Sequence, residues 1–139
     1  MAHWLVKSEP SSWSFDQQVK AGEKGTSWNG VRNHAAKLNL MKMKLGDQAF
    51  FYHSGDAREI VGIVEVSKLY YPDPTDKTGV FGMVDFRVVS ALPKPVTLEQ
   101  VKADKRLSNM VLVKISRLSV QPVTDPEWKI VCQMGGLRP

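Results

Sequence analysis

The sequence has few of the residues that build covalent or metal-bound frameworks. Its 139 residues include one cysteine, Cys132, and three histidines, His3, His34 and His53. A lone thiol cannot form an internal disulfide or a thiolate zinc cluster, and the histidines lack the i, i+4 spacing of a helical metal pair. We therefore expect no disulfide, no metal and no cofactor, and a protein of the reducing cytoplasm, or of the nucleus in a eukaryote.

Long apolar runs are also missing. The longest, Met110 to Ile115, is interrupted by Lys114 and is far shorter than the roughly 20 residues that span a bilayer. The first residues, Met1 to Lys7, lack the basic region, apolar stretch and cleavage site of a secretory signal. We expect no membrane partner. The length and the 42% hydrophobic content fit one domain, residues 1–139, which we expect to be monomeric.

Motifs of nucleotide enzymes are absent as well. Neither G-x-G-x-x-G nor G-x-x-x-x-G-K-[ST] occurs, and the H-x-E and C-x-x-C signature of base deaminases is missing. His53 and Ser54 resemble a hydrolase pair, but no G-x-S-x-G elbow exists, and neighbouring residues of a strand point to opposite faces. The sequence therefore predicts a protein that is not an enzyme.

Positive charge is in excess. Lys and Arg number 19 against 14 Asp and Glu, for a formal charge of +5. This balance favours a polyanion such as RNA or DNA as the partner. Four basic residues and no acid fall within residues 32–44, and five fall within residues 102–117 against Asp104 alone. Such segments can follow a phosphate backbone, although they are also typical of a solvated surface.

The apolar pattern predicts an α+β fold. Segments of alternating or continuous apolar residues predict strands at residues 3–7, 48–53, 60–70 and 80–89. Capping boxes and apolar spacing predict short helices at residues 15–21, 32–43, 98–104 and 125–134. Gly62 and Gly82 interrupt strands, as at bulges and barrel bends. The expected architecture is a curved, barrel-like mixed sheet with short peripheral helices.

The most informative stretch is Trp28-Asn29-Gly30-Val31-Arg32-Asn33. A tryptophan offers a stacking face for a base, the start of a helix attracts anions, and Arg32 adds a fixed positive charge. These features together suit a nucleotide. The equal alternative is that Trp28 is a buried core residue beside an ordinary Asn29-Gly30 turn.

Two strand ends and one arginine add candidates. Lys7-Ser8-Glu9-Pro10 could hold a cation, a hydroxyl and a carboxylate at a rim, although a solvated turn with a local Lys7–Glu9 ion pair is the favoured interpretation of this segment alone. In Phe50-Phe51-Tyr52-His53-Ser54, alternation places Phe51 and His53 on one side and Tyr52 and Ser54 on the other. One side is expected to be core, and the other could place Tyr52 or His53 against a base. Arg117 is expected in a strand, between hydroxyl residues.

These segments together resemble the EVE domain family. The similarity extends, in the same order, over Trp4–Pro10, Trp28–Asn33, Phe50–Ser54, Ile60–Ile63, Tyr71–Asp76 and Ser116–Val123. The resemblance implies a PUA-like fold, a pseudo-barrel with peripheral helices related to the YTH readers of methylated adenine. It further implies binding to RNA or DNA and, in some members, recognition of a modified cytosine.

Matched motif by motif, the resemblance implies a base pocket formed by Lys7, Ser8, Trp28, Asn29, Gly30, Arg32, Asn33, Tyr52, His53, Ser54 and Arg117. Trp28 would stack on the base, and Lys7, Arg32 and Arg117 would hold flanking phosphates. The family commonly has aspartate where this chain has Asn29, and often tyrosine at Trp13 and His34, so the preferred base stays open. The alternative is an enzyme or binding module acting on a free nucleotide or another small anionic ligand in the same pocket.

Overall fold

A mixed, six-stranded sheet forms the centre of the molecule. The computed structural model describes residues 2–137, and the strand order is β2-β5-β4-β3-β1-β6. The strands are β1 (His3–Ser8), β2 (Thr26–Ser27), β3 (Gln48–His53), β4 (Glu59–Pro72), β5 (Gly82–Thr97) and β6 (Val120–Val123). β1 and β3 are parallel, and the other neighbours are antiparallel. The sheet is open, with β2 and β6 at its edges.

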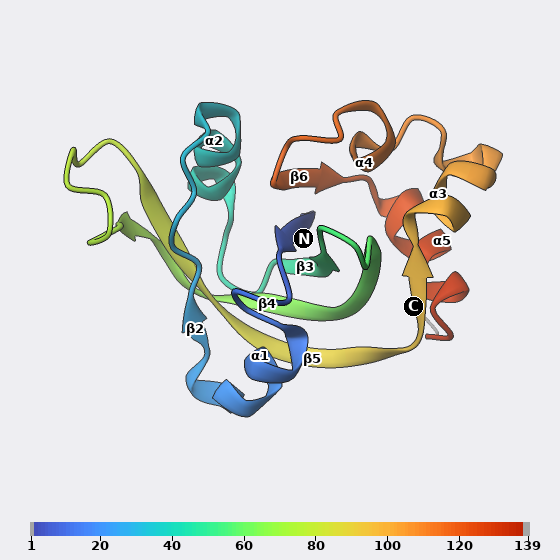
Figure 1. Ribbon diagram of the computed structural model, residues 1–139, viewed down its shortest axis with the longest axis horizontal. Coiled ribbons are helices and arrows are strands. Elements are labelled where there is room, and N and C mark those ends of the chain that lie inside the picture. Colours follow the sequence, from blue (N-terminus) through green and yellow to red (C-terminus); the bar gives the residue numbers. More distant parts are fainter. Residues whose placement is uncertain (1, 138–139) are drawn as a thin grey trace.

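Short helices surround the sheet. They are α1 (Phe15–Ala21), α2 (His34–Lys42), α3 (Leu98–Ala103), α4 (Val111–Lys114) and α5 (Asp125–Met134), with 3-10 turns η1 (Gly22–Lys24) and η2 (Lys105–Leu107). β4 and β5 sweep as long curved strands past α1, while α3, α4 and α5 gather at the end of the molecule far from the β4–β5 connection (Figure 1). The prediction of an α+β fold with a curved sheet and peripheral helices is confirmed. No helix within residues 2–137 is long and apolar enough to cross a membrane.

Capping boxes start three of the helices as predicted. The side chains of Ser14, Thr97 and Thr124 each accept a hydrogen bond from the backbone N–H three residues on, and the residue there bonds back. α2 begins later than predicted, because Asn33 is its N-cap and accepts from the Ala36 N–H at 3.0 Å. The predicted helical position of Arg32 was therefore wrong.

Bulges bend the two longest strands. The β4–β5 pairing shifts register at four places, one of them between Ile60 and Gly62. Gly62 is required there because the Phe15 ring lies against it: a Cβ on Gly62 would be 2.2 Å from Cζ of Phe15. β5 also begins two residues later than predicted and continues to Thr97, since the shifts let it curve without losing its partner.

Both faces of the central strands are buried. Val6 and Phe51 belong to a core covered by α1 and α2, whereas Leu5 and Phe50 belong to a second core covered by α3, α4 and α5. Continuous apolar runs in β1 and β3 reflect this double burial. Phe50 and Phe51 are fully buried, as core aromatics, and only the ends of the strand reach the surface.

The parallel pairing of β1 and β3 fixes where polar groups meet. Lys7 lies opposite Tyr52, and Ser8 lies opposite His53. The carboxyl ends of the two strands therefore open at the same edge of the sheet, where loops from both sides converge.

Candidate functional site

A cleft of about 370 Å³ opens at the carboxyl end of β1. Three segments form it, namely the end of β1, the loop that leads into α1, and β2 with the residues that follow it. Its lining comprises Lys7, Ser8, Ser12, Trp13, Thr26, Ser27, Trp28 and Asn29. The structure therefore brings four of the predicted residues together, Lys7, Ser8, Trp28 and Asn29.

Trp28 belongs mainly to the core. Its side chain is 7% exposed and meets Phe51 and Phe86 edge-on, with ring centroids 5.4 Å apart in both pairs. Its backbone N–H donates to the Val84 carbonyl at 2.8 Å. The interpretation of Trp28 as a core residue is confirmed, and its stacking on a base stays a prediction, for which the small exposed part of the ring lines the cleft.

Trp13 is the second ring of the cleft, and sequence reasoning missed it. Its Nε1 donates to Oε1 of Gln18 at 2.8 Å, and the fully buried Gln18 donates in turn to the Phe86 carbonyl at 3.0 Å. Ser8 Oγ donates to the Trp13 carbonyl at 2.7 Å. The half-buried indole is therefore held through its Nε1, and the Trp13 backbone is held through its carbonyl. One signal in the sequence was available. Trp13 directly precedes a capping box and does not belong to the apolar pattern of any predicted helix or strand, so a buried place in the core was not expected for it.

Uncharged hydrogen-bonding groups complete the cleft. Asn29 is exposed, and its carboxamide makes no hydrogen bond to any residue within 2–137. A carboxamide both donates and accepts, so this group can pair with either kind of atom on a ligand. Hydroxyls of Ser12, Thr26 and Ser27 lie nearby, and Lys7 is the single charged residue of the lining. The cleft suits a flat, uncharged ring with a polar edge.

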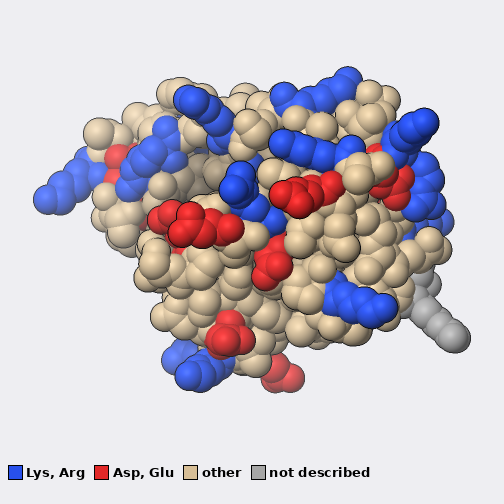
Figure 2. Space-filling view, turned by 45° about the vertical axis from the view of Figure 1, so that its right-hand side comes forward, with Lys and Arg blue, Asp and Glu red and all other residues tan. Residues whose placement is uncertain are grey.

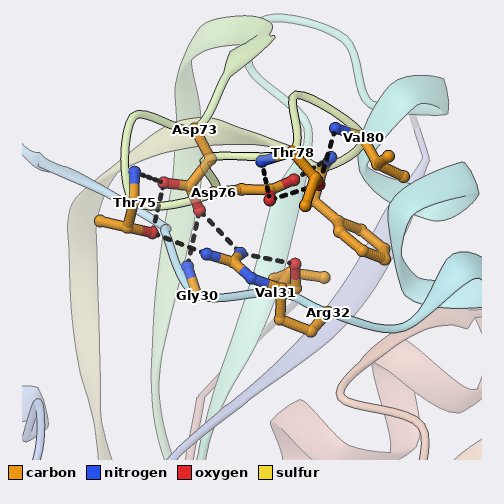
Figure 3. Close-up of polar contacts among 9 residues, drawn as sticks. Gly30, Val31, Arg32, Asp73, Thr75, Asp76, Thr78 and Val80 are labelled. Atoms are coloured by element: carbon orange, nitrogen blue, oxygen red, sulfur yellow. Dashed lines mark hydrogen bonds and ion pairs between the residues drawn. The ribbon is translucent and has the colours of Figure 1, made fainter.

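Gly30 and Arg32 lie outside the lining of the cleft and both bond to Asp73. The Asp73 carboxylate, 2% exposed, accepts from the Gly30 N–H at 2.8 Å and from Nη1 of Arg32 at 3.1 Å. It also accepts from the backbone and hydroxyl of Thr75, at 2.7 and 2.6 Å (Figure 3). Arg32 forms an ion pair with Asp73 in this cluster, but its side chain is 40% exposed, so its contact with a flanking phosphate stays a prediction. Asn33 caps α2 outside the cleft.

This cluster of Asp73 with Gly30, Arg32 and Thr75, the Asp73 clamp, holds the β4–β5 connection against residues 30–32. Burial alone would raise the pKa of Asp73, but hydrogen bonds from Thr75, Gly30 and Arg32 outweigh it and hold that pKa at about 2. Asp76 further along the connection accepts from Thr78 and from the Phe81 N–H. This network keeps Asn29, next to Gly30, at a fixed position beside the cleft.

The Asp73→Asn variant tests the clamp. Since the pKa of Asp73 falls from 3.8 to about 2 on folding, the folded state binds fewer protons, and the carboxylate stabilises the fold above about pH 4. That contribution is lost as the pH falls from about 4 through about 2. We expect the variant to lose roughly 1–3 kcal/mol near neutral pH and to show a flatter melting temperature across the acid range. Asp56→Asn, in an exposed turn, is the matched control and should follow wild type.

The remaining predicted residues lie outside the cleft. His53 Nε2 accepts from the Phe15 N–H at 3.0 Å, and burial lowers the pKa of His53, so it is a neutral structural acceptor. Tyr52 and Ser54 face the opposite side of the sheet, in a separate cavity that Lys7 also lines. Arg117 lies in a turn before β6, and its predicted place in a strand was wrong. The Leu118 N–H closes this turn by donating to the Ile115 carbonyl at 3.2 Å, and the pairing of β6 with β1 begins only at Val120.

Groups that bind metals or react covalently do not cluster. Within residues 2–137, no three His, Cys, Asp or Glu side chains lie close enough to hold a metal ion. Cys132 is buried, and burial raises the pKa of its thiol to about 11, which suppresses the reactive thiolate.

A model of the EVE domain family matches residues 2–134. The chain belongs to the EVE domain family. Thymocyte nuclear protein 1 of Gallus gallus is 35% identical, over 99% of this chain and 70% of its own length. The human protein of the same name is 32% identical, over 96% of this chain and 73% of its own length. The family resemblance read from the sequence motifs is confirmed.

Two solved structures place the fold of this EVE domain among its relatives. Rpa0253 of Rhodopseudomonas palustris is 59% identical, with a TM-score of 0.92 over 98% of this chain and 94% of that one. The human THYN1 protein, solved in complex with DNA containing 5-methylcytosine, is 32% identical, with a TM-score of 0.91 over 100% of both chains. Most motif residues of this EVE domain fall in the tryptophan cleft, the Asp73 clamp or the second cavity. Asn33, His53 and Arg117 lie outside all three.

Proposed function

We propose that this EVE domain binds nucleic acid and accepts one base, methylated or otherwise modified, into the cleft between Trp13 and Trp28, without catalysing a reaction. The cleft itself carries the proposal, since it joins two fixed indoles to uncharged donors and acceptors in about 370 Å³. Its relative, the human THYN1 protein, was solved with DNA containing 5-methylcytosine, which supports DNA as a partner and a modified cytosine as the base.

Two kinds of contact would bind the base: stacking on an indole ring, and hydrogen bonds to the polar edge of the base. Trp13 offers the larger open ring surface, and stacking of a base on an aromatic ring contributes about 1–3 kcal/mol. Asn29 and the hydroxyls can then pair with the polar edge of the base. A base inside a duplex cannot reach the cleft, so it must leave its stack or come from a single strand.

The charge of the cleft favours a base over a free anion. One lysine among eight lining residues is a weak site for a phosphate, whereas an uncharged ring needs no counter-charge. His53 supports the non-catalytic assignment, because the nitrogen that could activate a hydroxyl already accepts the Phe15 N–H.

The decisive experiment is fluorescence anisotropy with RNA and DNA oligonucleotides, single- and double-stranded. Each carries cytosine or adenine in its unmodified, methylated or hydroxymethylated form. We expect one base form to bind preferentially, Trp13→Ala to weaken that binding by about tenfold or more, and Trp13→Phe, which keeps a ring, to retain much of it. Weak and equal binding of every oligonucleotide, with a free nucleotide binding more tightly, would overturn the proposal.

A further inference from the structure

A second cavity of about 350 Å³ opens on the other face of the same sheet edge. Alternation along β1 places Ser8 with Val6 on the side of the tryptophan cleft and Lys7 with Leu5 on the side of this cavity, although Lys7, near the strand end, also lines the cleft. Tyr52, opposite Lys7 on β3, faces the cavity as well. One strand end therefore separates two cavities of different chemistry.

Positive charge dominates the second cavity. Lys7, Arg58 and Lys102 line it, and none of its lining residues is acidic, although Glu9 lies beside Gly55 at the rim. Arg58 and Lys102 are exposed, and neither side chain makes an ion pair within residues 2–137. Three uncompensated cations around one concavity attract an anion.

Lys7 and Tyr52 form the inner wall. The Lys7 amino group donates to the Ser116 carbonyl and lies 5.5 Å from the centre of the Tyr52 ring. Burial lowers the pKa of Lys7, a penalty that a bound anion would offset. Burial also raises the pKa of Tyr52, partly opposed by the nearby charge of Arg58. The phenol therefore stays protonated as a donor, and it makes no hydrogen bond to another described residue.

The backbone of Arg58 holds its side chain at the rim in an unusual conformation. Arg58 has a φ of 47°, the one positive value at a non-glycine residue within 2–137. The Leu98 N–H fixes this conformation by donating to the Arg58 carbonyl at 2.9 Å. A left-handed arginine is strained, and such residues concentrate at ligand sites.

We propose that the second cavity binds a backbone phosphate of the nucleic-acid strand whose base occupies the tryptophan cleft. This rests on the proposed function and assigns the phosphate contacts to Lys7, Arg58 and Lys102, with the Tyr52 hydroxyl as a further donor. The nucleic-acid strand passes the carboxyl ends of β1 and β3, with its base on one face of the sheet and its phosphate on the other. Lys and Arg side chains gather along the upper part of the surface, where a recess lies between two groups of them (Figure 2). They provide a path for the rest of the strand.

The test compares wild type with Arg58→Gln/Lys102→Gln, which leaves the tryptophan cleft untouched. Affinity for a labelled single strand of DNA with one 5-methylcytosine, and for its unmethylated twin, is measured at several salt concentrations. Loss of one phosphate contact should weaken binding by about tenfold and lower the slope of log Kd against log salt by about 0.7. The ratio of the affinities for the methylated and the unmethylated strand should stay unchanged. Lys20→Gln/Lys24→Gln, two exposed lysines on α1 and η1, is the matched control and should keep the wild-type slope.

A neutral methylphosphonate next to the methylated base locates the contact. This neutral group should weaken binding by the wild-type protein by about the same factor as the Arg58→Gln/Lys102→Gln substitutions do. It should not weaken binding by the double variant any further. Additive effects, or an unchanged salt slope while Trp13→Ala abolishes the base preference, would overturn the phosphate site and leave the proposed function standing. A double variant that loses affinity for 5-methyldeoxycytidine monophosphate but not for the strand would also overturn it. If the double variant lowers the salt slope but the wild-type protein shows no preference among bases, the proposed function is overturned and the phosphate site stands.

Discussion

Replacing Trp28 with alanine should lower the free energy of unfolding by about 3–5 kcal/mol, the loss typical of a large aromatic core residue. The ring is 7% exposed and packs edge-on against Phe51 and Phe86, so its removal leaves a cavity beneath the cleft. Urea denaturation followed by circular dichroism measures the loss. Binding by this variant is meaningful only under conditions where circular dichroism shows it folded.

Trp13→Ala is the matched control for Trp28. The same residue type is removed, but Trp13 is half-buried at the rim, so we expect a smaller loss of stability and a larger specific loss of base preference. The two tryptophans then separate folding from binding. Equal destabilisation by both variants would contradict the assignment of Trp28 to the core.

Gly62→Ala should have a comparably large effect from the addition of one methyl group. The new Cβ would lie 2.2, 2.3 and 2.8 Å from three atoms of the Phe15 ring, so the ring must leave its place in the core. Losing the packing of a buried phenylalanine costs roughly 3 kcal/mol or more. Phe15 begins α1, and α1 carries Gln18, which holds Trp13. We therefore expect both a lower melting temperature and weaker binding.

Shortening Phe15 should relieve the clash. In the Gly62→Ala/Phe15→Leu double variant the smaller side chain leaves room for the methyl group, so the double variant should be more stable than Gly62→Ala alone. Strictly additive losses in thermal denaturation would show that the two residues do not compete for the same space.

Local signals in the sequence predicted most elements of this fold. Capping boxes at Ser14, Thr97 and Thr124 located three helices, and Gly62 located a bend, because each of these features depends on neighbours within a few residues. The family motifs then identified four residues of the cleft. The first and last residues of β5 and α2 were less predictable, because register shifts set the length of β5 and the N-cap sets the start of α2.

Long-range pairing explains the rest. Nothing local indicates that Asp73 neutralises Arg32, 41 residues away, so Arg32 looked like a free cation. Likewise, the parallel alignment of β1 and β3 is not encoded in either strand, and it decides that Tyr52 faces a different cavity from Ser8. Trp13 was missed in part because its partner Gln18 is itself held by the Phe86 carbonyl, 68 residues from Gln18 in the sequence.

The position of β1 between β3 and β6 has a consequence for how the protein matures. Lys7 contacts Ser116, which lies 109 residues later in the sequence, so the ribosome makes the first wall of the second cavity long before the last one. Closing so large a loop is slow compared with forming a helix or hairpin. An emerging chain that ends before β6 holds β1 without its final neighbour. The second cavity therefore takes its final form late, when the first strand of the sheet is enclosed by the last.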